Sequence, residues 1–318
     1  MAKVVIIGAG FVGSTTAYAL MLGGTAQEIV LIDKKKEKAH GEAMDLSHGA
    51  SFIKPVHIYA GEYEDCKNAD IIIITAGASQ EQGQTRMDLV EINTGVMKEI
   101  LTDILEHNTD AIFIVVTNPV DIMSYVVWKF SNLPHSRIIG SGTVLDTSRF
   151  RHLLSARCNI DPRNIHAYVI GEHGDSEVPL WSTANVAGIP LTAFCETCTN
   201  VCSSKKRDDL IQKVRESAYE IISEKGATYY AIALALRRIA ESILRDEHSV
   251  LTVSSLIDGN YGVKDIYLSV PCVLGRDGVE NIIPFELNDE EKRNFIRSAE
   301  VVKRSLPIEF TETFARHS

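Results

Sequence analysis

Apolar and polar positions in the first half of the chain follow a repeating order of short strand and longer helix. Five short runs are dense in valine and isoleucine: Val4–Ile7, Ile29–Ile32, Val56–Tyr59, Ile71–Thr75 and Ala111–Val116. Near-continuous apolar runs of this length are typical of parallel strands buried on both faces. The segments 11–22, 37–48 and 87–107 between them are predicted helices. We therefore expect an α/β fold with a doubly wound parallel sheet, the Rossmann arrangement.

The pattern changes after about residue 142. The predicted elements here are helices over 146–157 and about 206–246, and strands over 166–170, Ser249–Ser255, Tyr267–Leu274 and Gly278–Pro284. A last helix begins at Asn288, because an asparagine followed by three acidic residues suits a helix amino end. No low-complexity linker separates the halves. We expect a doubly wound domain over 1–142 and an α+β domain over 143–318, packed closely with a cleft between them.

Composition narrows the class of protein. The net charge of −10 argues against a nucleic-acid partner, which would require a basic face. The longest apolar runs are far too short to span a membrane, and the amino end lacks the layout of a secretion signal. The six cysteines are scattered over 318 residues, unlike those of a small disulfide scaffold. These features predict a cytoplasmic enzyme with neither nucleic-acid nor membrane partners.

A glycine-rich turn follows the first predicted strand. Gly8, Gly10 and Gly13 have the spacing that permits a tight turn, close backbone approach to a pyrophosphate, and close packing of helix on strand. Asp33 ends the second strand, where a carboxylate would accept both ribose hydroxyls and repel a 2′-phosphate. This combination predicts NAD as cofactor. The alternative is an aspartate that only shapes a turn.

A polar cluster follows the predicted strand 166–170. His173 lies on a glycine-flanked loop, and a histidine whose ordinary pKa is near neutrality suits exchange of a hydroxyl proton. Asp146 is the first residue of the helix predicted over 146–157. Its carboxylate could orient that histidine or merely cap the helix. Arg149, one turn further on, has a planar fork that fits a carboxylate. Taken alone, His173 could equally be a structural loop residue.

Two further segments follow strands and face the same predicted cleft. The segment Gly77–Arg86 is polar, contains two glycines and precedes a long helix, which suits a lid that carries an arginine into a closing site. A plain solvent loop is the alternative. Asn118 follows the strand Ala111–Val116 and adds an amide near the same edge.

Together these residues resemble the lactate/malate dehydrogenase family along nearly the whole chain. The matching segments are Gly8–Gly13, Asp33, Gly77–Arg86, Thr117–Asp121, Gly140–Arg151 and His166–Pro179. The resemblance implies hydride transfer between NADH and a small 2-oxoacid. It assigns proton exchange to His173, orientation of that histidine to Asp146, binding of the substrate carboxylate to Arg149, and polarisation of the carbonyl to Arg86.

The resemblance also implies the remaining contacts. Asn118 would lie at the substrate and the nicotinamide, and Thr228 would line the substrate pocket. The implied cofactor-binding residues are Gly8, Gly10, Val12, Gly13, Asp33, Lys38, Tyr63, Gly77, Ala78, Asn118, Ser141 and Ile232. Gln80 stands where the family has glutamine in lactate enzymes and arginine in malate enzymes. A second carboxylate beside neutral Gln80 would be buried unpaired, so we expect pyruvate/L-lactate as the substrate pair.

The family implies a homotetramer as well. Arg151 and His166 match residues that bind fructose 1,6-bisphosphate between subunits in activator-dependent bacterial members. Arg151 is two residues after Arg149, about 200° round the helix, and so points away from the substrate. The alternative is that both residues only form salt links between subunits.

Two rival interpretations stay open. The first is a malate dehydrogenase or broader 2-oxoacid reductase, which Gln80 disfavours. The second is a non-catalytic NAD-binding or redox-sensing protein, in which Cys195, Cys198 and Cys202 would form the switch. Three clustered thiols could also suggest a metal, but no fourth ligand is evident, so we expect none.

Overall fold

A computed structural model describes residues 2–78, 85–197, 204–307 and 310. The side chains of Arg86, 196–197 and 204–206 also lie outside the described part. The expected fold class is confirmed: a doubly wound sheet is followed by a second α/β region.

Strands and helices alternate through the first half of the chain, as predicted. The strands are β1 (Lys3–Ile7), β2 (Glu28–Ile32), β3 (His57–Ala60), β4 (Ile71–Ile74), β5 (Ile112–Val115), β6 (Ile138–Gly140), β7 (Ile165–His166), β8 (Val169–Ile170), β9 (Val178–Pro179), β10 (Asn185–Val186), β11 (Ile189–Pro190), β12 (Ser249–Asp258), β13 (Lys264–Gly275) and β14 (Gly278–Ile282). The helices are α1 (Phe11–Gly23), α2 (Lys36–His48), α3 (Arg86–Leu105), α4 (Val120–Ser131), α5 (Val144–Cys158), α6 (Leu191–Thr197), α7 (Ser204–Lys225), α8 (Tyr230–Leu244) and α9 (Asp289–Arg304).

The main sheet has the strand order β14-β13-β12-β6-β5-β4-β1-β2-β3 among the described residues. Its six strands from β3 to β6 are parallel, and every carboxyl end therefore meets one edge. The pairing turns antiparallel at β12, which joins β6 through Ser254 opposite Gly140. Because the sheet continues into strands of the second half, both halves share one framework.

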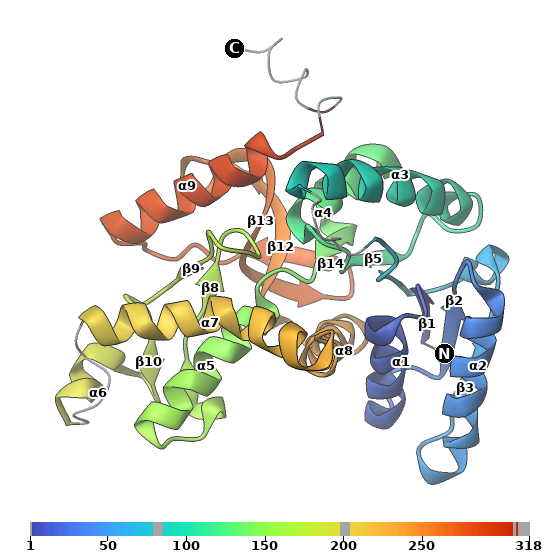
Figure 1. Ribbon diagram of the computed structural model, residues 1–318, viewed down its shortest axis with the longest axis horizontal. Coiled ribbons are helices and arrows are strands. Elements are labelled where there is room, and N and C mark those ends of the chain that lie inside the picture. Colours follow the sequence, from blue (N-terminus) through green and yellow to red (C-terminus); the bar gives the residue numbers. More distant parts are fainter. Residues whose placement is uncertain (1, 79–84, 198–203, 308–309, 311–318) are drawn as a thin grey trace.

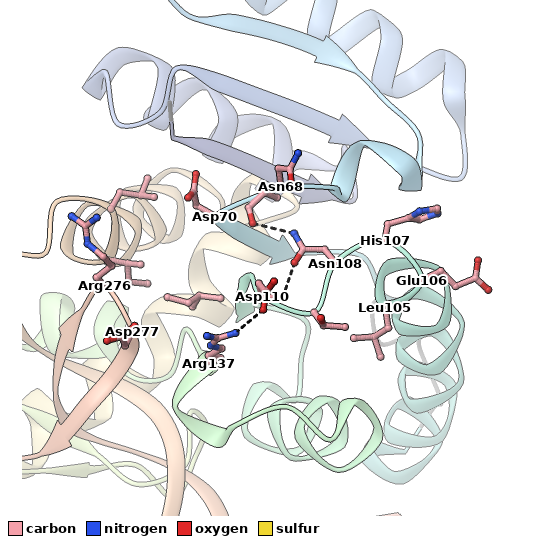
Figure 2. A pocket seen from close by; sticks show the side chains of 15 residues that line it. Asn68, Asp70, Leu105, Glu106, His107, Asn108, Asp110, Arg137, Arg276 and Asp277 are labelled. Atoms are coloured by element: carbon pink, nitrogen blue, oxygen red, sulfur yellow. Dashed lines mark hydrogen bonds and ion pairs between the residues drawn. The ribbon is translucent and has the colours of Figure 1, made fainter.

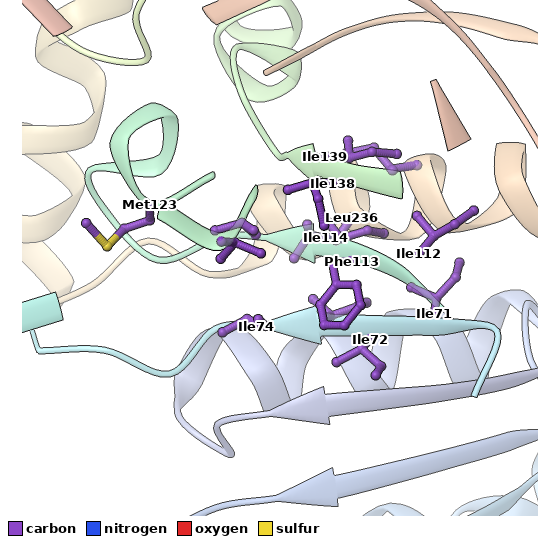
Figure 3. Close-up of a cluster of buried hydrophobic side chains, with 14 of the residues drawn as sticks. Ile71, Ile72, Ile74, Ile112, Phe113, Ile114, Met123, Ile138, Ile139 and Leu236 are labelled. Carbon is purple, nitrogen blue, oxygen red and sulfur yellow. The ribbon is translucent and has the colours of Figure 1, made fainter. Parts of the chain in front are cut away.

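The core lies where the parallel strands are buried on both faces. All four isoleucines of β4 are fully buried, and β5 is equally covered. Figure 3 shows these side chains together with Met123 of α4 and Leu236 of α8. Leu236 comes from the second half of the chain, so the core itself ties the two halves together.

The helices cover both faces of the sheet. Figure 1 shows α3 and α4 on one side of the parallel strands, and α1 beside α8 on the other. The glycine-rich turn precedes α1, and the loop after β8 faces the same region as the start of α5. This arrangement brings the carboxyl ends of the parallel strands opposite the polar loops of the second half.

The prediction of a single strand over 166–170 is wrong. The chain instead forms β7 and β8, which belong to different small sheets and are separated by two residues. Side chains of α5 occupy the backbone groups that a strand partner would need: Arg151 Nε donates to the Ala167 carbonyl at 2.9 Å, and Val169 N donates to Thr147 Oγ1 at 2.9 Å. Local apolar character could not reveal these bonds.

The helical region predicted over about 206–246 is two helices. Gly226, at φ +86°, ends α7, and α8 begins at Tyr230. The prediction at Asn288 is confirmed, because its side chain accepts from Glu291 N at 2.9 Å and caps α9. The strands and helices without a counterpart among the predicted elements are β6, β9, β10, β11, α4 and α6. Within the described residues, no helix combines the length and apolar character needed to cross a membrane.

Candidate active site

The glycine-rich turn has the shape that its spacing predicts. Gly8 adopts φ +103°, and a Cβ there would lie 2.8 Å from Ala76 N. A Cβ on Gly13 would lie 1.8 Å from the Gly8 carbonyl oxygen, so only glycine lets α1 pack against the turn. A Cβ built on Gly10 would have no atom of the described residues within 4 Å. Helix α1 therefore presents an open amino end, which favours an anionic group.

Asp33 lies beside this turn. Its Oδ2 accepts from Ala9 N at 2.8 Å and its Oδ1 from Lys35 N at 2.9 Å. The carboxylate therefore shapes the turn, as the alternative interpretation held. Each oxygen keeps a further lone pair, so the same group can also accept from ribose hydroxyls. Open space at Gly10 and an acceptor at Asp33 together fit the phosphate and ribose parts of NAD.

A buried asparagine joins the next two strand ends. Asn93 of α3 accepts from Ala78 N at 2.8 Å and donates from Nδ2 to the Asn118 carbonyl at 2.7 Å. A Cβ on Gly77 would lie 2.3 Å from Thr117 Cγ2, so this loop too requires glycine. The sequence analysis missed Asn93. Its position three residues after buried Val90 on an apolar helix face was an available signal.

Asp146 holds two functional groups at once. It lies in the first turn of α5 after the N-cap Thr143 and caps nothing. Its Oδ2 lies 2.6 Å from His173 Nδ1, and its Oδ1 accepts from an Arg149 guanidinium nitrogen at 2.8 Å. Because His173 Nδ1 is bonded to a carboxylate, Nε2 is the ring nitrogen left for a substrate.

The charges of this cluster stabilise one another. Asp146 raises the pKa of His173 to about 9, against the effect of burial. Burial acts to raise the pKa of Asp146, but His173 and Arg149 outweigh it, and the pKa lies below its usual range. The histidine is therefore protonated and the aspartate ionised at neutral pH. An imidazolium ready to give a proton stands next to a guanidinium ready to bind an anion.

A second buried carboxyl group supports the loop from below. Asp121, near the start of α4, accepts from His173 N at 2.8 Å and from Ser254 Oγ at 2.6 Å. Burial raises the pKa of Asp121 to about 6. The sequence analysis matched the segment that contains Asp121 but gave it no role. Only the fold brings α4 beneath the loop after β8.

His173, Asp146 and Arg149 line one cavity of about 740 Å³ between the two halves. Of the predicted site residues, those that line it are Val12, Gly77, Ala78, Asn118, Asp146, Arg149, His173 and Thr228. Its wall is completed by residues of α7, among them Arg215 and Tyr219, and by Glu177. The predicted residues in the described chain that do not line it are Gly8, Gly10, Gly13, Asp33, Lys38, Tyr63, Ser141, Ile232, Arg151 and His166.

Several predicted residues cannot be placed against this cavity. Gln80 lies outside the described residues, and Arg86 is described only as the first residue of α3. Cys198 and Cys202 also lie outside, whereas Cys195 is buried and disulfide-bonded. A cysteine in a disulfide offers no thiolate to a metal. In the described part of the chain, the exposed trio Asp246, His248 and Glu280 has suitable ligand atoms close together, away from this cavity.

A different cavity, of about 630 Å³, opens at the amino ends of the parallel strands. Figure 2 shows Asn108 at its centre, bonded to backbone groups, and Arg137 paired with Asp110 at 3.5 Å. Ligands of doubly wound sheets bind at the carboxyl ends of the strands. The cavity that contains His173 lies at that carboxyl edge.

Two features meet at the carboxyl edge of the sheet. One is the open amino end of α1 with Asp33 beside it, and the other is the cluster of His173, Asp146 and Arg149. This combination is typical of nicotinamide-dependent dehydrogenases. The chain belongs to the lactate/malate dehydrogenase family. Residues 2–140 match the NAD binding domain of that family, and residues 143–313 match its alpha/beta C-terminal domain. The family resemblance and the NAD prediction are thereby confirmed.

Named relatives agree with this assignment. The chain is 56% identical over 303 residues to L-lactate dehydrogenase of Thermoanaerobacter sp. (strain X514), covering 95% of this chain and 97% of the relative. It is 54% identical to L-lactate dehydrogenase 1 of Clostridium acetobutylicum, covering 96% and 97%. A solved structure, a lactate dehydrogenase from a Medee basin deep-sea metagenome library, superposes with a TM-score of 0.93 at 44% identity, covering 96% and 97%.

Proposed function

We propose that this chain catalyses the reversible reduction of pyruvate to L-lactate with NADH. The observation that carries the proposal is Asp146, whose two oxygens hold His173 and Arg149 side by side at 2.6 and 2.8 Å. Steady-state consumption of NADH, compared for pyruvate and oxaloacetate, tests it directly. Faster reduction of pyruvate supports the proposal. Turnover with neither substrate, or preference for oxaloacetate, contradicts it.

The residues of the chain divide the work as follows. Arg149 spends one of its donors on Asp146 and directs the rest of its fork to the substrate carboxylate. His173 Nε2 gives its proton to the carbonyl oxygen, and ionised Asp146 stabilises the imidazolium until it does so. Arg86 polarises the same carbonyl. The nicotinamide, when bound, supplies hydride to the carbon in reduction and takes it up in oxidation.

The cofactor is held along the carboxyl edge of the sheet. Gly8, Gly10 and Gly13 position the pyrophosphate at α1, and Asp33 accepts from the adenosine ribose. Val12, Gly77, Ala78 and Asn118 line the path toward His173. Lys38, Tyr63, Ser141 and Ile232 complete the proposed contacts, and Thr228 borders the substrate.

Gln80 sets the preference for pyruvate. Gln80→Arg is expected to raise the ratio of kcat/KM for oxaloacetate to kcat/KM for pyruvate by about 100-fold or more. The new cation would pair with the second carboxylate of oxaloacetate, whereas the methyl group of pyruvate would leave it unpaired. The two specificity constants are measured on one preparation. Gln82→Arg adds the same charge two residues away and is the control. An unchanged ratio in Gln80→Arg would show that this residue does not face the substrate.

We also propose that the enzyme acts as a cytoplasmic homotetramer. Large apolar side chains are exposed on α1 and α8, which lie next to each other: Phe11, Tyr18, Leu22, Tyr230 and Leu234. Phe11 is 69% exposed and Tyr230 65%. A neighbouring cluster of this kind is typical of a surface that a second copy covers.

Arg151 and His166 form the proposed fructose 1,6-bisphosphate site. Arg151, which is partly buried, donates from Nε to the carbonyl of Ala167, the neighbour of exposed His166, so the two residues lie close together and away from the cavity. Two such pairs meeting at a two-fold axis suit a ligand with two phosphates.

Millimolar fructose 1,6-bisphosphate is therefore expected to lower the KM for pyruvate several-fold and to promote assembly, because it binds the assembled form. Pyruvate saturation curves and sedimentation velocity measure both effects. Arg151→Gln should lose the response, whereas Arg163→Gln, at an exposed arginine paired with Asp161, should keep it. If the activator changes neither KM nor assembly in the unmodified chain, the regulatory proposal fails and the catalytic one is unaffected.

A further inference from the structure

A buried carboxyl and a partly exposed guanidinium lie close together in the cavity wall. Glu177 lies four residues after His173, with its side chain 4% exposed. Arg215 extends from α7, donates to the Glu177 carbonyl at 3.0 Å, and has its Nε 4.0 Å from Glu177 Oε1. That Nε is buried and has no hydrogen-bond partner among the residues that the structure describes. The catalytic mechanism above uses neither residue.

The pair adjoins the groups that handle the proton. Glu177, Arg215, His173, Asp146 and Arg149 all line the same cavity. The charges that act on Glu177 are those of Asp146 and Arg149 on α5, His173 on its own loop and Arg215 on α7. The charges that act on His173 are, from the largest effect to the smallest, those of Asp146, of Asp121 on α4 and of Glu177. A charge that appears on Glu177 is therefore felt by the imidazolium.

We propose that Glu177, held in place by Arg215, is a positioning residue that keeps His173 protonated when the surroundings turn alkaline. This inference rests on the proposed proton-donor role of His173. A carboxylate stabilises a nearby imidazolium, and a buried cavity wall screens that attraction less than open water does. Arg215 binds the backbone of Glu177 to α7 and lies close to its carboxyl, which keeps Glu177 in the wall of the cavity that His173 also lines.

The pH range of the effect follows from the burial of the carboxyl. Burial, with the negative charge of Asp146, raises the pKa of Glu177 to about 8. The carboxyl is neutral well below that pH and ionised above it, where His173, with a pKa of about 9, begins to lose its proton. Glu177 therefore gains its negative charge in the same pH range in which His173 would otherwise lose its proton. Glutamine imitates the neutral form and cannot follow this change.

Glu177→Gln is expected to lower the pKa of His173 by about half to one unit. The measurement is an NMR titration of the chain carrying labelled histidine, in which His173 is assigned by the signal that Asn replacement removes; it requires no substrate. In kinetics, the alkaline limb of kcat/KM for pyruvate should move to lower pH. The ratio of variant to unmodified kcat/KM should then fall about 3- to 10-fold between pH 6.5 and 9.5.

Two further variants keep this test decisive. Glu177→Asp retains an ionisable carboxyl and should restore most of the His173 pKa. Glu172→Gln makes the same change on the same loop. The Glu172 carboxyl is buried, accepts from the Ser176 hydroxyl and does not line the cavity. This control should leave the pKa of His173 close to its original value. An unshifted His173 pKa in Glu177→Gln, or an activity ratio constant across pH, would overturn the inference. Lack of pyruvate turnover in the unmodified chain would refute the proposed function instead, and the titration would still report on Glu177.

Discussion

Replacing His173 with asparagine is expected to lower kcat for pyruvate by about 100- to 10,000-fold, the range that a general acid contributes. Asparagine cannot transfer the proton from the position of Nε2. The backbone N–H of residue 173 still donates to Asp121, so the loop should keep its course. The affinity for NADH should change less than about threefold, because the proposed cofactor contacts lie at Gly8–Gly13 and Asp33.

Two measurements separate catalysis from structure in this variant. Fluorescence titration gives the dissociation constant of NADH, and single-turnover kinetics give the rate of reduction. His107→Asn, at the cavity on the opposite edge of the sheet, is the matched control and should behave like the unmodified enzyme. A His173→Asn enzyme that loses NADH binding together with activity would show that the residue is structural.

Arg149→Lys is expected to lower kcat/KM for pyruvate by about 100- to 1,000-fold or more. Loss of a buried, bidentate carboxylate pair costs roughly 3–5 kcal/mol, and each tenfold corresponds to about 1.4 kcal/mol. Lysine keeps the charge but offers a single point donor, and it cannot bond Asp146 and the substrate with one planar fork. The side chain of Arg149 is 14% exposed, so water cannot replace the missing donors well.

The effect should fall mainly on pyruvate binding. Saturation curves with pyruvate and with its unreactive analogue oxamate measure it, while NADH affinity should stay within about threefold. Arg157→Lys, on the last turn of the same helix, makes the same exchange away from the cavity and serves as control. Retention of more than about a tenth of kcat/KM in Arg149→Lys would contradict its role as the carboxylate anchor.

The sequence predicted correctly those elements whose physical cause lies within a short stretch of chain. The central parallel strands β4 and β5 are apolar at every position because helices cover both faces, so the runs at Ile71 and Ile112 predict them directly. Gly13 is required by its close approach to the Gly8 carbonyl within one strand–turn–helix unit, and Gly8 by its own positive φ. Asn288 caps a helix through a residue three places away. Each of these causes lies within a short stretch of chain.

The interrupted strand and the two overlooked supporting residues share one cause. The strand predicted over 166–170 is interrupted because Arg151 and Thr147, on a separate helix, satisfy its backbone. Asn93 and Asp121 support the site through bonds to residues 25 and 52 positions away. Such partners leave no periodic signal, because a hydrogen bond across the fold depends on where distant elements pack.

The sequence by itself determined the fold class, the family and the cofactor, and it indicated His173, Asp146 and Arg149 as candidate site residues, because motifs in the right order record a shared architecture. Only the tertiary structure decided that Asp146 bonds His173 and Arg149 together, that Asp121 underlies the loop, and that Glu177 meets Arg215 in the cavity wall. The physical reason is that the charge state of a buried group depends on its neighbours in space. Those neighbours come from α4, α5 and α7, which are far apart along the chain.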